Sequence, residues 1–140
     1  MKKAFFILGG VILLTGCGNA KVEDKKLNCS IELETAQLDT SFTFDSEGKE
    51  LKEATMTGVY DISQEEAIVN YCKTVKSMHK DAECDFETDS TTVTVNAKMP
   101  IDKMSAENIK NLNFHGVNLY EGITYESLNS KIEANGATCK

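Results

Sequence analysis

Polar and apolar residues alternate where the folded part of the chain begins. Over residues 27–34, the apolar positions are Leu27, Cys29, Ile31 and Leu33. A period of two predicts a β-strand with one buried face and one exposed face.

A β-hairpin is predicted next along the chain. Residues 40–44 place Phe42 and Phe44 on one face, residues 45–48 can turn the chain at a glycine, and residues 51–60 are rich in Thr, Val and Tyr. Two such segments joined by a short turn with a glycine are typical of a hairpin.

The period then changes to that of a helix. Ser63 and Glu66 have the spacing of a capping box, in which the serine accepts from the first-turn amides and the glutamate reaches back. Apolar residues follow at helical spacing: Ile68, Tyr71, Cys72, Val75 and Met78. We therefore predict an amphipathic helix over residues 64–79.

A second hairpin is predicted after this helix. Cys84 and Phe86 share one face of a strand, and a strand over residues 91–97 returns after a turn at Asp89 and Ser90. Pro100 is expected to end the returning strand because it has no N–H to donate to a sheet.

Two shorter helices are predicted in the last third of the chain. Ser105 begins the first, which reaches to about residue 112, and Thr124 begins the second, which ends at Asn135 and Gly136. The whole order of elements predicts an α+β fold. We expect a two-layer sandwich, with a mostly antiparallel sheet of about five strands and the helices on one face.

The N-terminal segment has the pattern of an export signal. Lys2 and Lys3 precede the apolar run Ala4–Leu14, which is shorter than the ~20 residues of a membrane-spanning helix. Leu14-Thr15-Gly16-Cys17 then matches the lipobox of bacterial lipoproteins. An ordinary signal peptide that contains a cysteine, or a helix of the fold, is the alternative.

The expected organisation has three parts. Residues 1–16 are a lipoprotein signal peptide, residues 17–26 are the lipidated Cys17 with a polar tether, and residues 27–140 form a single α+β domain. Because two acyl chains such as palmitate anchor a protein stably, Cys17 is expected to hold the domain on the outside of the cell membrane or at the outer membrane. Gly18 after the cysteine leaves the envelope type open.

Four cysteines remain when Cys17 carries lipid, an even number in a chain that we expect to be exported. This favours two disulfides. Three pairings are possible, and we favour Cys72 with Cys84 because a strand that returns beneath the helix brings them together; Cys29 then pairs with Cys139. The alternative is a metal site formed by Cys72, His79 and Cys84 with Asp81 nearby, although no CxxC pair supports it.

Composition excludes some kinds of partner. The chain of 140 residues has a formal net charge of -7, and its basic residues are all lysines. Without a basic stripe or guanidinium groups, nucleic acid is not an expected partner.

Candidate catalytic groups are few. His79 is expected to lie at the end of its helix and His115 in a loop, and neither belongs to a known hydrolase motif. Acids at alternate positions predict a solvated strand face, with a cation site as the alternative: Asp81, Glu83, Asp85, Glu87 and Asp89. Four tyrosines could line a groove or lie at the edge of the core: Tyr60, Tyr71, Tyr120 and Tyr125.

A family resemblance covers most of the chain. After the lipobox come the aromatic strand Phe42-Thr43-Phe44, the hairpin segment Gly48–Leu51 and the helix start Glu65-Glu66-Ala67. Further segments in the same order contain Val93 and Val95, Ile101-Asp102, and a last helix with Leu128 and Lys131 before Gly136. This layout resembles the small YehR-like bacterial lipoproteins. The resemblance implies their fold and an envelope location, and it implies no catalytic residues because their molecular function is uncharacterised.

The sequence therefore predicts a membrane-anchored extracytoplasmic lipoprotein without catalytic activity. It is expected to bind an envelope protein or a small ligand, and it needs no cofactor. The alternative is a small hydrolase or metal-handling envelope protein that uses Cys72, His79 and Cys84.

Overall fold

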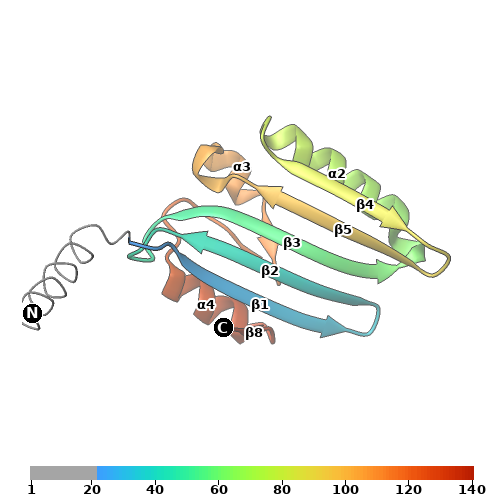
Figure 1. Ribbon diagram of the computed structural model, residues 1–140, viewed down its shortest axis with the longest axis horizontal. Helices are drawn as coiled ribbons and strands as arrows, with labels where there is room; N and C mark the ends of the chain where they lie inside the picture. The colour runs from blue at the N-terminus through green and yellow to red at the C-terminus, as the bar shows by residue number, and fades with distance from the viewer. Residues whose placement is uncertain (1–21) are drawn as a thin grey trace, which may run out of the picture.

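The computed structural model describes residues 22–140, and these residues form one antiparallel sheet covered on one face by helices (Figure 1). Six strands make up the sheet: β1 (Lys25–Leu33), β2 (Ala36–Phe44), β3 (Leu51–Asp61), β4 (Glu83–Thr88), β5 (Thr92–Met99) and β8 (Thr138–Cys139). Their spatial order is β4-β5-β3-β2-β1-β8. The predictions for residues 1–16 and Cys17 lie outside the described residues.

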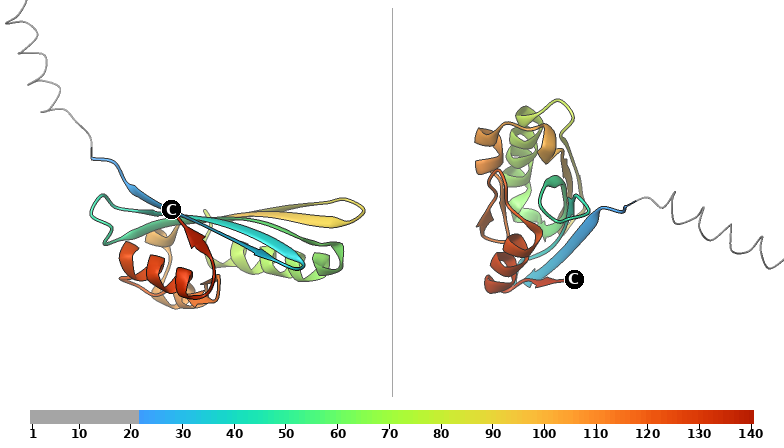
Figure 2. Two further views of the ribbon diagram at one scale, coloured as in Figure 1. Left: turned by 90° about the horizontal axis from the view of Figure 1, so that it is seen from below. Right: turned by 90° about the vertical axis from the view of Figure 1, so that its left-hand side faces the viewer.

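The second layer consists of helices and a small hairpin. Its members within residues 22–140 are the 3-10 turns η1 (Ile62–Gln64) and η2 (Ile101–Lys103), the helices α2 (Glu65–Met78), α3 (Ala106–Lys110) and α4 (Tyr125–Ala134), and the two-residue strands β6 (Asn113–Phe114) and β7 (Val117–Asn118). Figure 2 shows the three helices on the same side of the sheet. The predicted α+β two-layer architecture is therefore confirmed, with six strands in the sheet and not about five.

The extra strand and the start of β1 differ from the sequence prediction. β8 has only two residues, too short to show a period, and it joins the sheet because Cys29 and Ser30 pair with Cys139 and Thr138. β1 begins at Lys25, so the last two residues of the predicted tether belong to the sheet. Lys25 and Lys26 pair with the end of β2, which extends the ladder beyond the alternating apolar residues.

The start of the long helix also differs from the prediction. Ser63 lies inside the turn η1, where its N–H donates to the Asp61 carboxylate over 2.9 Å. Gln64, the residue before α2, makes no side-chain capping bond, so the predicted capping box does not form. The backbone N–H of Ile62 donates to Thr91 O over 2.9 Å, which ties the residue after β3 to the β4–β5 turn and favours the extra turn at η1.

The other helix boundaries follow the sequence signals. Ser105 Oγ accepts from the backbone N–H of Asn108, and Thr124 Oγ1 accepts from that of Ser127. Gly136 ends the last helix region with a φ of 97°, a conformation that favours glycine. Of residues 22–140, no helix is long and apolar enough to cross a membrane.

One disulfide joins the helical layer to the sheet, and the other joins two strands of the sheet. Cys72 of α2 is bonded to Cys84 of the edge strand β4, and Cys29 of β1 is bonded to Cys139 of β8, with Sγ–Sγ distances of 2.10 and 2.05 Å. This is the pairing that the sequence favoured. β4 does pass beneath α2, as that argument required.

The core lies between the inner face of the sheet and the helices. Its largest fully buried side chains come from every part of the fold: Leu27, Phe42, Phe44, Val75, Val93, Val95, Met99, Leu119, Ile123, Leu128 and Ile132. The outer face of the sheet carries mostly Thr, Ser, Asn and charged side chains, with Val59 as an exposed apolar residue. Binary patterning therefore determines which face the helices cover.

Candidate functional site

A cavity of about 520 Å³ opens on the inner face of the sheet. We call it the inner-face cavity. Its floor, from β1, β2 and β3, is Ile31, Leu33, Leu38, Thr40, Met56 and Tyr60; its walls are Gln64, Ala67, Ile68 and Tyr71 at η1 and α2, and Asn113–Gly116 at the β6–β7 turn. Small-molecule sites in proteins have volumes of roughly 300–1,000 Å³ and mostly apolar walls.

The cavity exists because the helices do not cover the whole inner face. α2 packs on β4 and β5, and α4 packs on β1 and β8. Between α2 and α4, the inner-face side chains of Ile31, Leu38 and Tyr60 are only partly buried. Leu33 at the end of β1 is 54% exposed. A continuous apolar surface is thus left open to a ligand.

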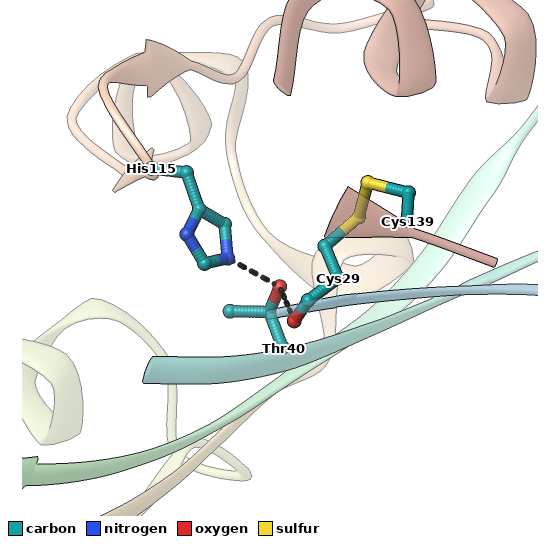
Figure 3. The surroundings of a disulfide bond; sticks show 4 residues. All are labelled: Cys29, Thr40, His115 and Cys139. Atoms are coloured by element: carbon teal, nitrogen blue, oxygen red, sulfur yellow. Dashed lines mark hydrogen bonds between the residues drawn. A yellow bond between two sulfur atoms is a disulfide. The ribbon is translucent and has the colours of Figure 1, made fainter. Parts of the chain in front are cut away.

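His115 enters this cavity from the β6–β7 turn. It has a φ of 51° and is followed by Gly116 with a φ of 80°, so both central residues of this two-residue turn are left-handed, as in a type I′ hairpin. Its Nε2 lies 2.8 Å from Thr40 Oγ1, and that hydroxyl lies 3.4 Å from the Cys29 carbonyl oxygen. Figure 3 shows these two hydrogen bonds beside the Cys29–Cys139 disulfide.

The hydrogen bonds assign the proton of His115. If the Thr40 hydroxyl donates to the Cys29 carbonyl, it accepts from Nε2–H, and Nδ1 then carries a lone pair. Nδ1 is buried and has no hydrogen-bond partner among the described residues. Burial lowers the pKa of His115, and the charge of Asp39 partly opposes this. The imidazole is therefore neutral at pH 7.

The same geometry bears on catalysis. A hydroxyl beside an imidazole resembles half of a nucleophile–base pair. In residues 22–140, however, no carboxylate or thiol is hydrogen-bonded to His115, and the Thr40 hydroxyl is directed at a backbone carbonyl. The contacts of Thr40 and His115 favour a structural link between the β6–β7 turn and the sheet.

Two of the four candidate tyrosines line the cavity. Burial raises the pKa of Tyr71 to about 12 and also raises the pKa of Tyr60. Tyr71 Oη lies 4.0 Å from Met56 Sδ. Tyr125 instead packs on Phe44, with ring centroids 5.7 Å apart, and Tyr120 is exposed on the surface.

The residues of the proposed metal or hydrolase site are brought together only in part. Cys72 and Cys84 are bonded to each other, so neither sulfur is available as a thiolate ligand or nucleophile. His79 follows α2, and its Nδ1 accepts from the Asp81 N–H over 3.1 Å. Within the described part of the chain, no group of three or more His, Cys, Asp or Glu side chains is placed to hold a metal ion.

The acidic side chains around β4 are exposed, as a solvated strand face requires. Asp89 closes the β4–β5 turn, where one carboxylate oxygen accepts from the N–H groups of Thr91 and Thr92 over 2.7 Å each. These bonds lower the pKa of Asp89 to about 2. Asp81 lies 3.4 Å from Lys103 Nζ. Both ends of the acidic series thus have partners within the protein.

The sequence suggested a groove lined by tyrosines, among them Tyr60 and Tyr71, but did not locate the cavity on the inner face of the sheet. It placed His115 in a loop but did not connect it to Thr40, which lies 75 residues earlier. Two local signals were available: the dipeptide His115-Gly116 between short strands, and Gly58 inside a strand. A glycine in a strand often marks a close approach to another group.

Comparison with known proteins shows the fold. No protein-family model and no curated protein matches the chain. The NMR structure of the Escherichia coli YehR protein aligns with a TM-score of 0.61, covering 86% of this chain and 92% of that chain at 13% identity. An NMR structure of a protein from Streptococcus pneumoniae TIGR4 aligns with a TM-score of 0.57, covering 87% and 88% at 13% identity. The chain therefore has a YehR-like fold.

Proposed function

We propose that this protein is a membrane-anchored extracytoplasmic lipoprotein that binds a small ligand in the inner-face cavity and has no catalytic activity. The observation that carries the proposal is the cavity itself, about 520 Å³ with mostly aliphatic and aromatic walls. Its size and lining match those of small-molecule sites. The ligand-binding proposal needs no residue outside the described domain.

The location rests on the sequence and on the cysteines. Leu14-Thr15-Gly16-Cys17 supports lipidation of Cys17, and the paired state of the other four cysteines supports an oxidising compartment. Labelling cells with an alkyne analogue of palmitate tests the anchor. We expect the wild type to be labelled and the Cys17→Ser variant to remain unlabelled; a wild type without label would refute the anchor.

Binding of a neutral solvatochromic dye, Nile red, to the purified domain tests the cavity. Ala67 is exposed at the cavity wall, so Ala67→Phe should obstruct the cavity without disturbing the core and weaken dye binding at least fivefold. Lys73→Phe adds the same ring elsewhere on α2 and should leave binding unchanged. Equal dye affinity in wild type, Ala67→Phe and Lys73→Phe would place the dye elsewhere and count against the cavity.

The absence of catalysis is tested at Thr40. If Thr40 and His115 acted as nucleophile and base, a short-chain chromogenic ester would be hydrolysed faster by the wild type than by Thr40→Val. We expect equal background rates for both proteins.

A further inference from the structure

The polar groups that line the inner-face cavity are all uncharged. They are the phenols of Tyr60 and Tyr71, the amides of Gln64 and Asn113, the Thr40 hydroxyl and the neutral His115 imidazole. None of the lining residues is Lys, Asp or Glu, although 26% of the chain is charged. A charged ligand group would find no opposite charge among these residues, and burying an unpaired ion is strongly unfavourable. The lining therefore favours an uncharged ligand group.

Tyr71 offers a hydrogen-bond donor that the protein uses poorly. The contact of its hydroxyl is a thioether sulfur at 4.0 Å, and a thioether is a weak acceptor. Tyr60 places a second, half-buried phenol on the same cavity. Because burial raises the pKa of both phenols, both stay protonated and can donate. A ligand with an acceptor oxygen would give these donors a better partner.

Gly58 leaves room for the Tyr60 ring to lie against the sheet at the floor of the cavity. Met56, Gly58 and Tyr60 are alternate residues of β3 and share the inner face. A Cβ at Gly58 would lie 2.5 Å from Tyr60 Cε2 and 3.1 Å from Leu38 Cδ2. The Tyr60 ring thus lies across the glycine, against the sheet. A methyl group at this position would lift the ring into the cavity.

The cavity is lined along β3 on one side and along η1 and α2 on the other. Its lining runs on β3 from Met56 to Tyr60, about 13 Å at ~3.3 Å per residue, and on the facing side from Gln64 to Tyr71. Most of the floor is aliphatic: Ile31, Leu33, Leu38 and Met56. Leu33 is exposed at the end of β1 and leaves one end open. The aliphatic floor and its length along β3 suit an extended chain.

We propose that the inner-face cavity holds a single aliphatic chain that ends in an uncharged acyl ester, whose carbonyl oxygen accepts hydrogen bonds from Tyr71 and Tyr60. The chain lies along the aliphatic floor, and the rest of the molecule extends to solvent. This assignment rests on the proposed ligand-binding function. Both a monoacylglycerol in a membrane and a free fatty ester in solution have this chemistry.

A matched pair of ligands tests the charge of the polar end. Displacement of Nile red from the purified domain at pH 8 compares 1-lauroylglycerol with laurate, which have the same chain but differ in charge. We expect the neutral ester to bind at least tenfold more tightly. Equal or tighter binding of laurate would overturn the assignment. Binding of the ester from solution but not from phosphatidylcholine vesicles would identify the free ester as the source, and transfer from vesicles would identify the membrane; both support the shared chemistry.

Variants test the role of the phenols. Tyr71→Phe keeps the ring and removes the donor, so affinity for 1-lauroylglycerol should fall by about two- to tenfold, the range of one neutral hydrogen bond. Tyr120→Phe, on the surface outside this cavity, is the matched control and should not change the affinity for 1-lauroylglycerol. An unchanged ester affinity in Tyr71→Phe and Tyr60→Phe would contradict the proposed contact.

A narrowing variant separates this inference from the proposed function. Gly58→Ala should weaken both Nile red and 1-lauroylglycerol, because the displaced Tyr60 ring fills the space that both use. Without Nile red or ester binding to the wild type, the small-ligand function fails as a whole. Dye binding that is sensitive to Gly58→Ala, without preference for the ester over laurate, leaves that function standing and overturns the ester assignment. If Gly58→Ala changes the affinity for neither Nile red nor 1-lauroylglycerol, this cavity is not the binding site.

Discussion

Thr40 is a buried polar residue that links three segments. It is 5% exposed, its hydroxyl contacts the carbonyl of Cys29 in β1, and it pairs with His115 of the β6–β7 turn. Thr40→Val keeps the shape but leaves His115 Nε2–H without its acceptor. We expect the free energy of unfolding to fall by about 1–3 kcal/mol, the cost of one unsatisfied buried group, as measured by urea denaturation.

A neighbouring threonine gives the control. Thr43 lies on the same strand but on the opposite face, so Thr43→Val should change stability by less than about 0.5 kcal/mol. Similar losses in both variants would mean that the effect belongs to the strand and not to the contact with His115.

The burial of His115 also predicts how stability depends on pH. Its pKa in the folded protein lies below the ordinary histidine value of about 6.5, so the unfolded chain takes up a proton more readily than the folded one. This histidine therefore costs no stability above about pH 6.5, and stability is lost as the pH falls below that value. We expect a lower Tm at pH 5.5 than at pH 7.5.

His115→Asn isolates this contribution, because asparagine tolerates a positive φ and does not titrate. The difference in Tm between pH 5.5 and 7.5 should be smaller in His115→Asn than in the wild type. An unchanged pH response in His115→Asn would assign the effect to other groups.

At the level of elements, the two disulfides differ in the length of chain that they close. Cys29 and Cys139 are 110 residues apart, and Cys72 and Cys84 are 12 apart. In the chain-entropy model a loop of a hundred residues stabilises by about 4.7 kcal/mol and one of fifteen by about 3 kcal/mol. We expect the Cys29→Ala/Cys139→Ala double variant to lose more stability than Cys72→Ala/Cys84→Ala in urea denaturation.

The reverse order of the two stability losses would point to core packing as the larger contribution. Cys72 and Cys84 are almost fully buried, so alanines there also lose core contacts. A larger loss for Cys72→Ala/Cys84→Ala would show that packing under α2, and not loop closure, dominates.

The elements that the sequence predicted are those with a local signal. The alternation around Leu27 and Cys29, the helical spacing after Ile68 and the cap at Thr124 each depend on residues close in the chain. The capping box at Ser63 was wrong because a tertiary hydrogen bond from Ile62 to Thr91 sets where the helix begins. β8 and the cavity depend on contacts between distant segments, which no local pattern contains.

At the scale of the whole molecule, each disulfide lies at one side of the sheet, next to one of the two longer helices. Cys72–Cys84 ties α2 to the edge strand β4. Cys29–Cys139 ties β8, which directly follows α4, to β1 near the opposite edge. The inner-face cavity lies between α2 and α4. Its width therefore depends on both attachments, while the central strands β2, β3 and β5 depend on neither.

Reduction of both disulfides should accordingly destabilise α2, α4 and β8 more than the central strands of the sheet. Hydrogen exchange by mass spectrometry, on protein refolded with both disulfides reduced, is expected to show faster exchange in α2, α4 and β8 than in the oxidised protein, with β2, β3 and β5 still protected. Nile red affinity should fall in the same sample because the cavity loses its fixed width. Loss of protection in the central strands together with the helices would show instead that the fold is one cooperative unit. In that case the cross-links stabilise the whole domain and do not shape the cavity in particular.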